Sequence, residues 1–132
     1  MPAARIGNNA SVTIKAVFYN ATDKRMLSAG DVVFAEGDVG HEMYGVVSGA
    51  IELRHGDKVV GRVGPEETFG ELAIIDAAPR ALTAVATEPS EIVAINERMF
   101  LFLVHETPTF ALQVMRSLSH VIRDLDEATS TD

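Results

Sequence analysis

Cysteine is absent from the 132 residues of this chain. Its absence excludes disulfide bonds, thiolate metal sites, iron–sulfur clusters and cysteine nucleophiles. A chain without disulfides suits a reducing compartment, and we expect a cytoplasmic protein. Long apolar runs are absent too, because the run at residues 100–104 is far shorter than the ~18 residues that cross a bilayer. The sequence therefore predicts no membrane-spanning segment.

Basic residues are scarce, with 11 lysines and arginines against 19 aspartates and glutamates and a net charge of −8. A surface of this sign repels the phosphate backbone, so we expect no direct binding to nucleic acid. Hydrophobic residues make up 47% of the chain, which is enough for a packed core and excludes general disorder. The length predicts a single domain over residues 1–132.

Short segments of β type, separated by glycines, fill the chain up to Asn96. Residues 11–20 alternate apolar and other side chains at period two, and further short apolar segments follow at close spacing. His55-Gly56-Asp57 lies between two of these segments and predicts a tight hairpin. Many short strands with regular turn signals are typical of an antiparallel sandwich or barrel. The strands expected after residue 20 are 32–35, 43–48, 51–54, 58–63, 82–86 and 92–95.

Beyond Asn96 the apolar spacing changes to that of helices. Asn96 is a good N-cap for a short helix, and Thr107-Pro108 is a start signal for a second helix. The second helix carries apolar residues at alternating steps of three and four. These residues form an apolar seam along the helix. The seam predicts either packing on the protein's own barrel or a helix–helix dimer contact, which Met115 and Ile122 would widen. The seam consists of Ala111, Val114, Leu118, Val121 and Leu125.

One stretch, residues 69–81 with the sequence FGELAIIDAAPRA, has the chemistry of an anion site. Gly70 lets a ligand approach the backbone closely, and the helical turn expected over 71–75 presents unpaired N–H groups. Arg80 can grip a phosphate through two parallel hydrogen bonds. Glu71 only accepts hydrogen bonds when it is ionised, so it suits sugar hydroxyls. Together these groups describe a site for a ribose phosphate.

The stretch FGELAIIDAAPRALTAVA resembles the phosphate-binding cassette of cyclic-nucleotide-binding domains. These domains occur in bacterial regulators of the catabolite-activator type, in cyclic-nucleotide-dependent kinases and in gated channels. The similarity extends over residues 26–125. It implies a mainly β fold, a double-stranded β-helix or jelly-roll-like β-roll of about eight antiparallel strands at 11–96, with C-terminal α-helices at 97–127. It also implies a stand-alone sensor domain without a helix-turn-helix.

The resemblance assigns ligand contacts to individual residues of the cassette. It implies that Glu71 binds the ribose 2′-hydroxyl of a cyclic nucleotide and that Arg80 binds the cyclic phosphate. The backbone groups expected to line the phosphate and the sugar belong to Gly70, Leu72, Ala73 and Ala81.

Several residues bear on ligand choice or depart from the family's pattern. Ala81 stands where sites that prefer cGMP usually carry a threonine, so the resemblance favours cAMP. Leu82 stands where the family often has a small residue, which predicts a tighter pocket wall. Glu66 and Glu67 add negative charge to the loop before the cassette and are expected to weaken anion binding. Residues 11–20 predict a strand where the family usually has helix.

The implied function is a sensor that binds cAMP, in preference to cGMP, and couples binding to movement of its C-terminal helices. We expect no catalytic residue, no cofactor besides this ligand and no metal site, because the four histidines show no paired ligand pattern. The alternative is a degenerate β-roll that acts as a dimerisation or protein-interaction scaffold without binding nucleotide. The expected partners are the cyclic nucleotide and either a second copy, through the C-terminal helix, or an unidentified effector protein.

Overall fold

The computed structural model describes Phe18 and residues 21–129 of the chain. Within this part, a short helix interrupts the series of strands and two helices follow the last strand. The strands are β1 (Lys24–Leu27), β2 (Val32–Phe34), β3 (Met43–Ser48), β4 (Ile51–His55), β5 (Lys58–Val63), β6 (Thr68–Phe69), β7 (Thr83–Ala86) and β8 (Ser90–Ile95). The helices are α2 (Leu72–Ile75), α3 (Glu97–Glu106) and α4 (Thr109–Thr129).

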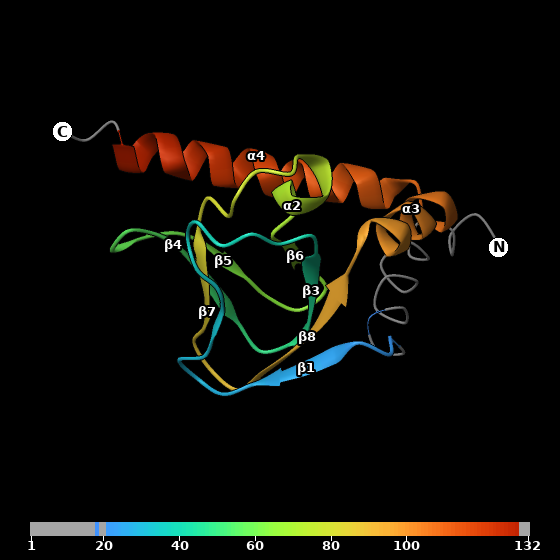
Figure 1. The fold of residues 1–132 in the computed structure, drawn as a ribbon, viewed down its shortest axis with the longest axis horizontal. Coiled ribbons are helices and arrows are strands. Elements are labelled where there is room, and N and C mark those ends of the chain that lie inside the picture. The colour runs from blue at the N-terminus through green and yellow to red at the C-terminus, as the bar shows by residue number, and fades with distance from the viewer. Residues whose placement is uncertain (1–17, 19–20, 130–132) are drawn as a thin grey trace, which may run out of the picture.

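The strands form two antiparallel four-stranded sheets, ordered β1-β8-β3-β6 and β2-β7-β4-β5. Figure 1 shows the sheets enclosing the interior of a roll, with α4 lying along one side and α3 at one end. The predicted jelly-roll-like β-roll with C-terminal helices is therefore confirmed. In the part of the chain that the structure describes, no helix is long and apolar enough to cross a membrane.

Three aromatic rings pack on one another inside the roll. The ring centroids of Phe34 and Tyr44 lie 6.1 Å apart, those of Phe34 and Phe69 6.0 Å, and those of Tyr44 and Phe69 5.3 Å. Such pairs add about 0.5–1.5 kcal/mol each beyond the burial of their area. Because the rings come from β2, β3 and β6, they join the two sheets directly beneath the segment that follows β6.

A second apolar cluster joins the roll to the helices. Leu103 of α3 and Phe110 of α4 are almost fully buried against side chains of β3 and β8. Burying a side chain of this size contributes about 1.5–3 kcal/mol. The start of α4 is therefore fixed on the roll. The buried members of the cluster are Phe18, Met43, Val93, Ile95, Leu103, Phe110 and Val114.

Most strands lie where the apolar segments predict them. β3 and β5 have the predicted bounds, and the predicted hairpin is present, with His55 paired to Lys58 across a two-residue turn. The sequence does not predict β1 or β6, because β1 contains no buried residue and β6 has only two residues. Neither strand therefore leaves an alternating pattern of useful length.

The strand predicted over residues 11–20 lies outside the described residues except at Phe18. There the prediction is wrong, because the backbone of Phe18 is helical. The ring of Phe18 is buried in the second cluster and packs so closely on Gly45 that no Cβ fits there.

The C-terminal helices begin as their capping signals predict. The Asn96 side chain accepts a hydrogen bond from the Met99 backbone N–H at 2.9 Å, and α4 begins directly after Pro108. The seam packs on the protein's own roll: Val121 and Leu125 contact the interior cluster, and Val114 and Leu118 belong to the second cluster or pack on it. A different stripe of α4 stays exposed, formed by Leu112, Met115 and Ile122.

Candidate functional site

A cavity of about 130 Å³ lies between the roll, α2 and α4. Its wall on the roll side includes Phe34 of β2 and Leu53 of β4, which sequence reasoning did not select. Its opposite wall comes from α4, through Leu118, Val121 and Leu125 of the seam and the more exposed Ile122. All seven residues predicted as ligand contacts line this one cavity: Gly70, Glu71, Leu72, Ala73, Arg80, Ala81 and Leu82.

Arg80 places a buried cation at this cavity. The residue is only 8% exposed, and its Nη1 and Nη2 donate to the backbone carbonyls of Gly70 at 3.1 Å and Glu42 at 2.7 Å. Its Nε is buried and has no hydrogen-bond partner among the described residues. A buried donor without a partner costs about 1–3 kcal/mol, and more when it belongs to a charged group. The geometry therefore leaves this guanidinium incompletely satisfied.

The surroundings of Arg80 hold the guanidinium in place without neutralising it. Its central carbon lies 4.1 Å from the ring centroid of Phe34 and 5.8 Å from that of Tyr44. Burial lowers the pKa of Arg80, and the neighbouring Tyr44, Glu42 and Asp38 act in the opposite direction. An arginine stays protonated in proteins all the same. In the part of the chain that the structure describes, no carboxylate oxygen lies within ion-pair distance of it.

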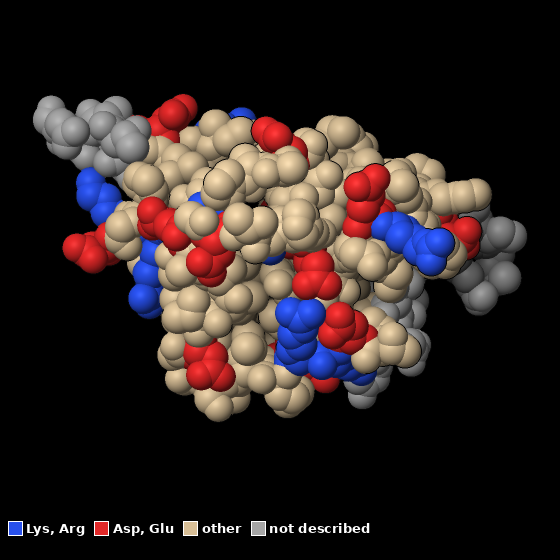
Figure 2. All heavy atoms as spheres, in the orientation of Figure 1, with Lys and Arg blue, Asp and Glu red and all other residues tan. Residues whose placement is uncertain are grey.

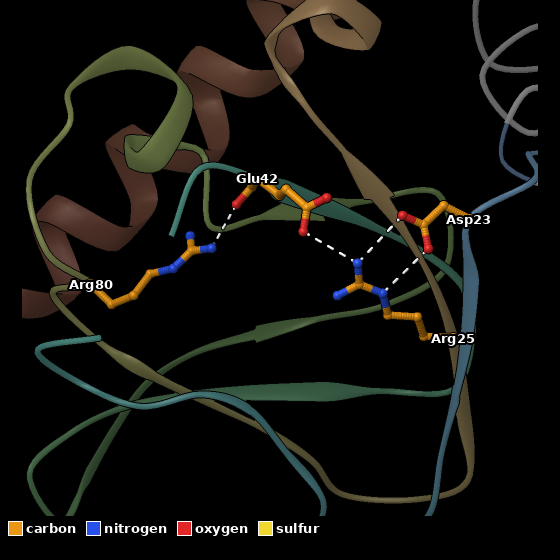
Figure 3. A network of polar contacts seen from close by, with 4 residues as sticks. All are labelled: Asp23, Arg25, Glu42 and Arg80. Atoms are coloured by element: carbon orange, nitrogen blue, oxygen red, sulfur yellow. Dashed lines mark hydrogen bonds and ion pairs between the residues drawn. The ribbon is translucent and has the colours of Figure 1, made fainter. Parts of the chain in front are cut away.

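A chain of polar contacts runs from Arg80 to β1 (Figure 3). Glu42 accepts from Arg80 through its backbone carbonyl, while its carboxylate accepts from Arg25 at 3.3 Å. Arg25 also pairs with Asp23 at 3.4 Å. These last contacts are exposed, so each adds at most about 1 kcal/mol. They occupy the Glu42 carboxylate with another cation and leave Arg80 without an acidic partner.

Glu71 places a buried carboxylate at the same cavity. The residue is 3% exposed, and its Oε2 accepts a hydrogen bond from the Thr68 hydroxyl at 2.7 Å. No arginine or lysine within the described part of the chain forms an ion pair with it. A buried cation and a buried carboxylate thus line one cavity without pairing. This arrangement suits a ligand that carries an anionic group and a hydroxyl group.

Two glycines give the Arg80 side chain its room. A Cβ on Gly40 would lie 2.5 Å from Nη2 of Arg80, and one on Gly70 would lie 3.0 Å from Nη1 and 3.2 Å from the Phe34 ring. Gly70 also has a φ of +77°, a conformation that disfavours other residues. A larger residue at Gly40 would displace the guanidinium, and one at Gly70 would press on it and strain the backbone.

The two glutamates before the cassette do not line the cavity. The Glu67 carboxylate accepts from the Gly64 backbone N–H at 2.7 Å, which closes the turn before β6. The carbonyl of Glu66 accepts from the Gln113 side chain of α4 at 2.8 Å. Both residues therefore belong to the turn and its contact with α4. The weakening of anion binding by their charge stays a prediction.

The match to known proteins agrees with this geometry. A family model described as the cyclic nucleotide-binding domain matches residues 24–107. The chain belongs to the cyclic nucleotide-binding domain family. The matched domain is a regulatory ligand-binding module and not a catalytic one. Among the described residues, no group of three histidines, aspartates or glutamates is arranged to hold a metal ion.

Individual members of the cyclic nucleotide-binding domain family are similar to the chain over most of its length. The cyclic AMP receptor protein of Thermus thermophilus is 30% identical over 108 residues, which cover 78% of this chain and 50% of that protein. The chain therefore spans about half the length of this relative. The crystal structure of the Thermus thermophilus catabolite activator protein has a TM-score of 0.69 at 27% identity and covers 92% of this chain and 57% of that one.

A further solved structure belongs to a cyclic-GMP-dependent signalling pathway that regulates bacterial phytopathogenesis. It is 33% identical, has a TM-score of 0.63, and covers 76% of this chain and 84% of that chain. The similarity in sequence and fold therefore extends to proteins linked with either cyclic purine nucleotide.

An Arg80→Met substitution tests whether the cation is structural. We expect the free energy of unfolding without ligand to change by no more than about 1 kcal/mol, because the lost hydrogen bonds to carbonyls are offset by relief of a desolvated charge. Urea unfolding followed by circular dichroism measures this change. Leu103→Ala, a buried control, should lose about 2–5 kcal/mol in the same assay. A loss above about 3 kcal/mol for Arg80→Met would instead assign a structural role to Arg80 and its hydrogen bonds to the two carbonyls.

Proposed function

We propose that the cavity binds a cyclic nucleotide, with cAMP preferred over cGMP, and that binding changes the position of α4. The unpaired Arg80 and Glu71 support this proposal. The Arg80 guanidinium, with its free Nε–H, would bind the cyclic phosphate. The Glu71 carboxylate would accept a hydrogen bond from the ribose 2′-hydroxyl. One ribose cyclic phosphate would thereby satisfy two buried charges that the protein leaves apart.

The preference for cAMP is supported by the residue after the arginine. Ala81 lines the cavity and offers no hydroxyl group to the amino group of guanine. The remaining wall near it consists of apolar side chains, including Leu82 and Leu125. A purine would therefore be recognised by shape and burial more than by hydrogen bonds. We accordingly expect the discrimination between cAMP and cGMP to be modest.

Coupling to α4 is supported by the position of the helix on the cavity. Leu118, Val121, Ile122 and Leu125 line it, so a bound base would contact the helix directly. The start of α4 is fixed by the buried Phe110, whereas the residues from 118 to 126 are only partly buried or exposed. A ligand shifts an equilibrium when it contacts one arrangement better than another. The second half of α4 is the part that a ligand in this cavity would move.

Thermal unfolding with cAMP, cGMP and 5′-AMP tests the proposal. At 100 times its Kd a ligand stabilises the folded state by about 2.7 kcal/mol. For a chain of this size we expect a rise in Tm of about 10 °C with cAMP, a smaller rise with cGMP at the same concentration, and none with 5′-AMP. Arg80→Leu should abolish the rise, because loss of one partner of a charge contact costs about 2–5 kcal/mol.

The matched control for that variant is Arg98→Leu, which removes an exposed arginine outside the cavity. It should keep the full rise in Tm with cAMP. No rise with any nucleotide for the parent chain would contradict the sensor function and leave the scaffold alternative.

The exposed stripe of α4 favours a second function, association with another copy of the chain. Leu112, Met115 and Ile122 are 48%, 61% and 57% exposed and lie on one side of the helix. Figure 2 shows acidic and basic side chains spread over the visible face of the molecule. No block of one charge on the visible face opposes contact between two copies. A parallel or antiparallel pair of α4 helices would cover the stripe.

Sedimentation equilibrium tests this association. We expect a dimer at about 100 μM, a concentration that favours even a weak contact, and a monomer for Met115→Glu, because a charge would be buried in the contact between the two α4 stripes. Met26→Glu makes the same chemical change at an exposed position on β1, away from α4, and should remain dimeric. A monomeric parent at this concentration would contradict the dimer.

A further inference from the structure

Thr68 is a buried hydroxyl group that contacts the carboxylate of the cavity. The residue is 2% exposed, and its Oγ1 donates to Oε2 of Glu71 at 2.7 Å. This is the single hydrogen bond to the Glu71 side chain among the described residues. Thr68 itself does not line the cavity. It stands behind the carboxylate, on the side away from a ligand.

The backbone of Thr68 is fixed from two directions. In β6 it pairs with Gly45 of β3, the neighbouring strand of the sheet. Its carbonyl accepts from the Ser117 hydroxyl of α4 at 3.2 Å. A donor whose backbone is fixed by both a strand and a helix has little freedom to move. The direction of its hydroxyl group is therefore set before any ligand arrives.

A carboxylate at this position needs such a fixed donor. The Glu71 side chain has three rotatable bonds, and an acceptor-only carboxylate that is buried costs free energy without a partner. The guanidinium of Arg80 lines the same cavity and would attract it. The bond from Thr68 occupies Oε2, keeps the carboxylate away from Arg80, and leaves Oε1 to accept from a ligand. Hydrogen bonds to a charged acceptor are about twice as strong as neutral ones.

We propose that Thr68 is a positioning residue that gives the site its selectivity for a free 2′-hydroxyl, by holding the Glu71 carboxylate ready to accept from it. This inference rests on the proposed binding of a cyclic nucleotide. Thr68 does not touch the nucleotide. Removing its hydroxyl weakens ligands that use Glu71 and spares those that do not.

The test compares the Kd values of cAMP and 2′-deoxy-cAMP by calorimetry on the full chain. The parent binds cAMP more tightly than the deoxy ligand. Thr68→Val keeps the shape of the side chain and removes its hydroxyl, and it lowers the affinity for cAMP by about tenfold while leaving the deoxy ligand unchanged. Thr68→Ser restores the hydroxyl and keeps the parent's ratio of the two Kd values. Thr87→Val, the same change at an exposed residue outside the cavity, leaves both Kd values unchanged.

An equal loss for both ligands in Thr68→Val, or no loss for either, overturns the positioning role, because the ratio of Kd values is then that of the parent. If Thr68→Val does not fold, Thr68→Cys replaces the hydroxyl by a weak donor of similar size, and the same fall in the ratio is expected. If Thr68→Cys has the same ratio of the two Kd values as the parent, the positioning role is also overturned. A parent chain that binds neither ligand instead overturns the proposed function itself.

Discussion

Two opposite charges are buried at one cavity and kept apart, and the organisation of the site depends on this separation. The Arg80 guanidinium donates to two backbone carbonyls and lies over the Phe34 ring, while the Glu71 carboxylate accepts from Thr68. Charges buried without a partner are costly, and a protein selected for stability alone would pair them or replace them by apolar residues. A ligand that brings an anionic group and a hydroxyl group to the cavity would offset the free-energy cost of keeping the two charges apart.

The helix α4 connects this cavity to the rest of the molecule through two different faces. One face packs on the roll, with Val121 and Leu125 against the interior cluster, and forms the cavity wall. The neighbouring stripe of Leu112, Met115 and Ile122 is exposed, and its Ile122 also lines the cavity. A shift of the second half of the helix would move Ile122 together with the cavity wall, and so would change one end of the exposed stripe. Occupancy of the cavity and association of the chain are thus expected to be linked.

The sequence predicts which residues surround the cavity better than it predicts strands β1 and β6, for a physical reason. The residues predicted as ligand contacts all lie within positions 70–82, so a local motif specifies them, and the structure brings all of them to one cavity. Phe34, Glu42 and Thr68 come from other strands and loops, and only the paired sheets reveal that they meet the cassette. The sequence predicts the apolar seam of α4. Whether that seam packs on the roll or on a second copy depends on tertiary packing, which the sequence alone does not give. Phe18 shows the same limit, because its helical backbone contradicts a period-two pattern.

The Nε–H of Arg80 offers the most direct test that the buried cation awaits an anion. Its resonance is identified in the ¹⁵N-edited NMR spectrum as the arginine side-chain signal that Arg80→Lys removes. In the free protein this donor has no hydrogen-bond partner within the described part of the chain. On addition of cAMP the account predicts a downfield shift and slower exchange with water, as expected for a charge-assisted hydrogen bond to phosphate. An unchanged Arg80 signal at saturating cAMP, with other resonances shifting, would contradict it.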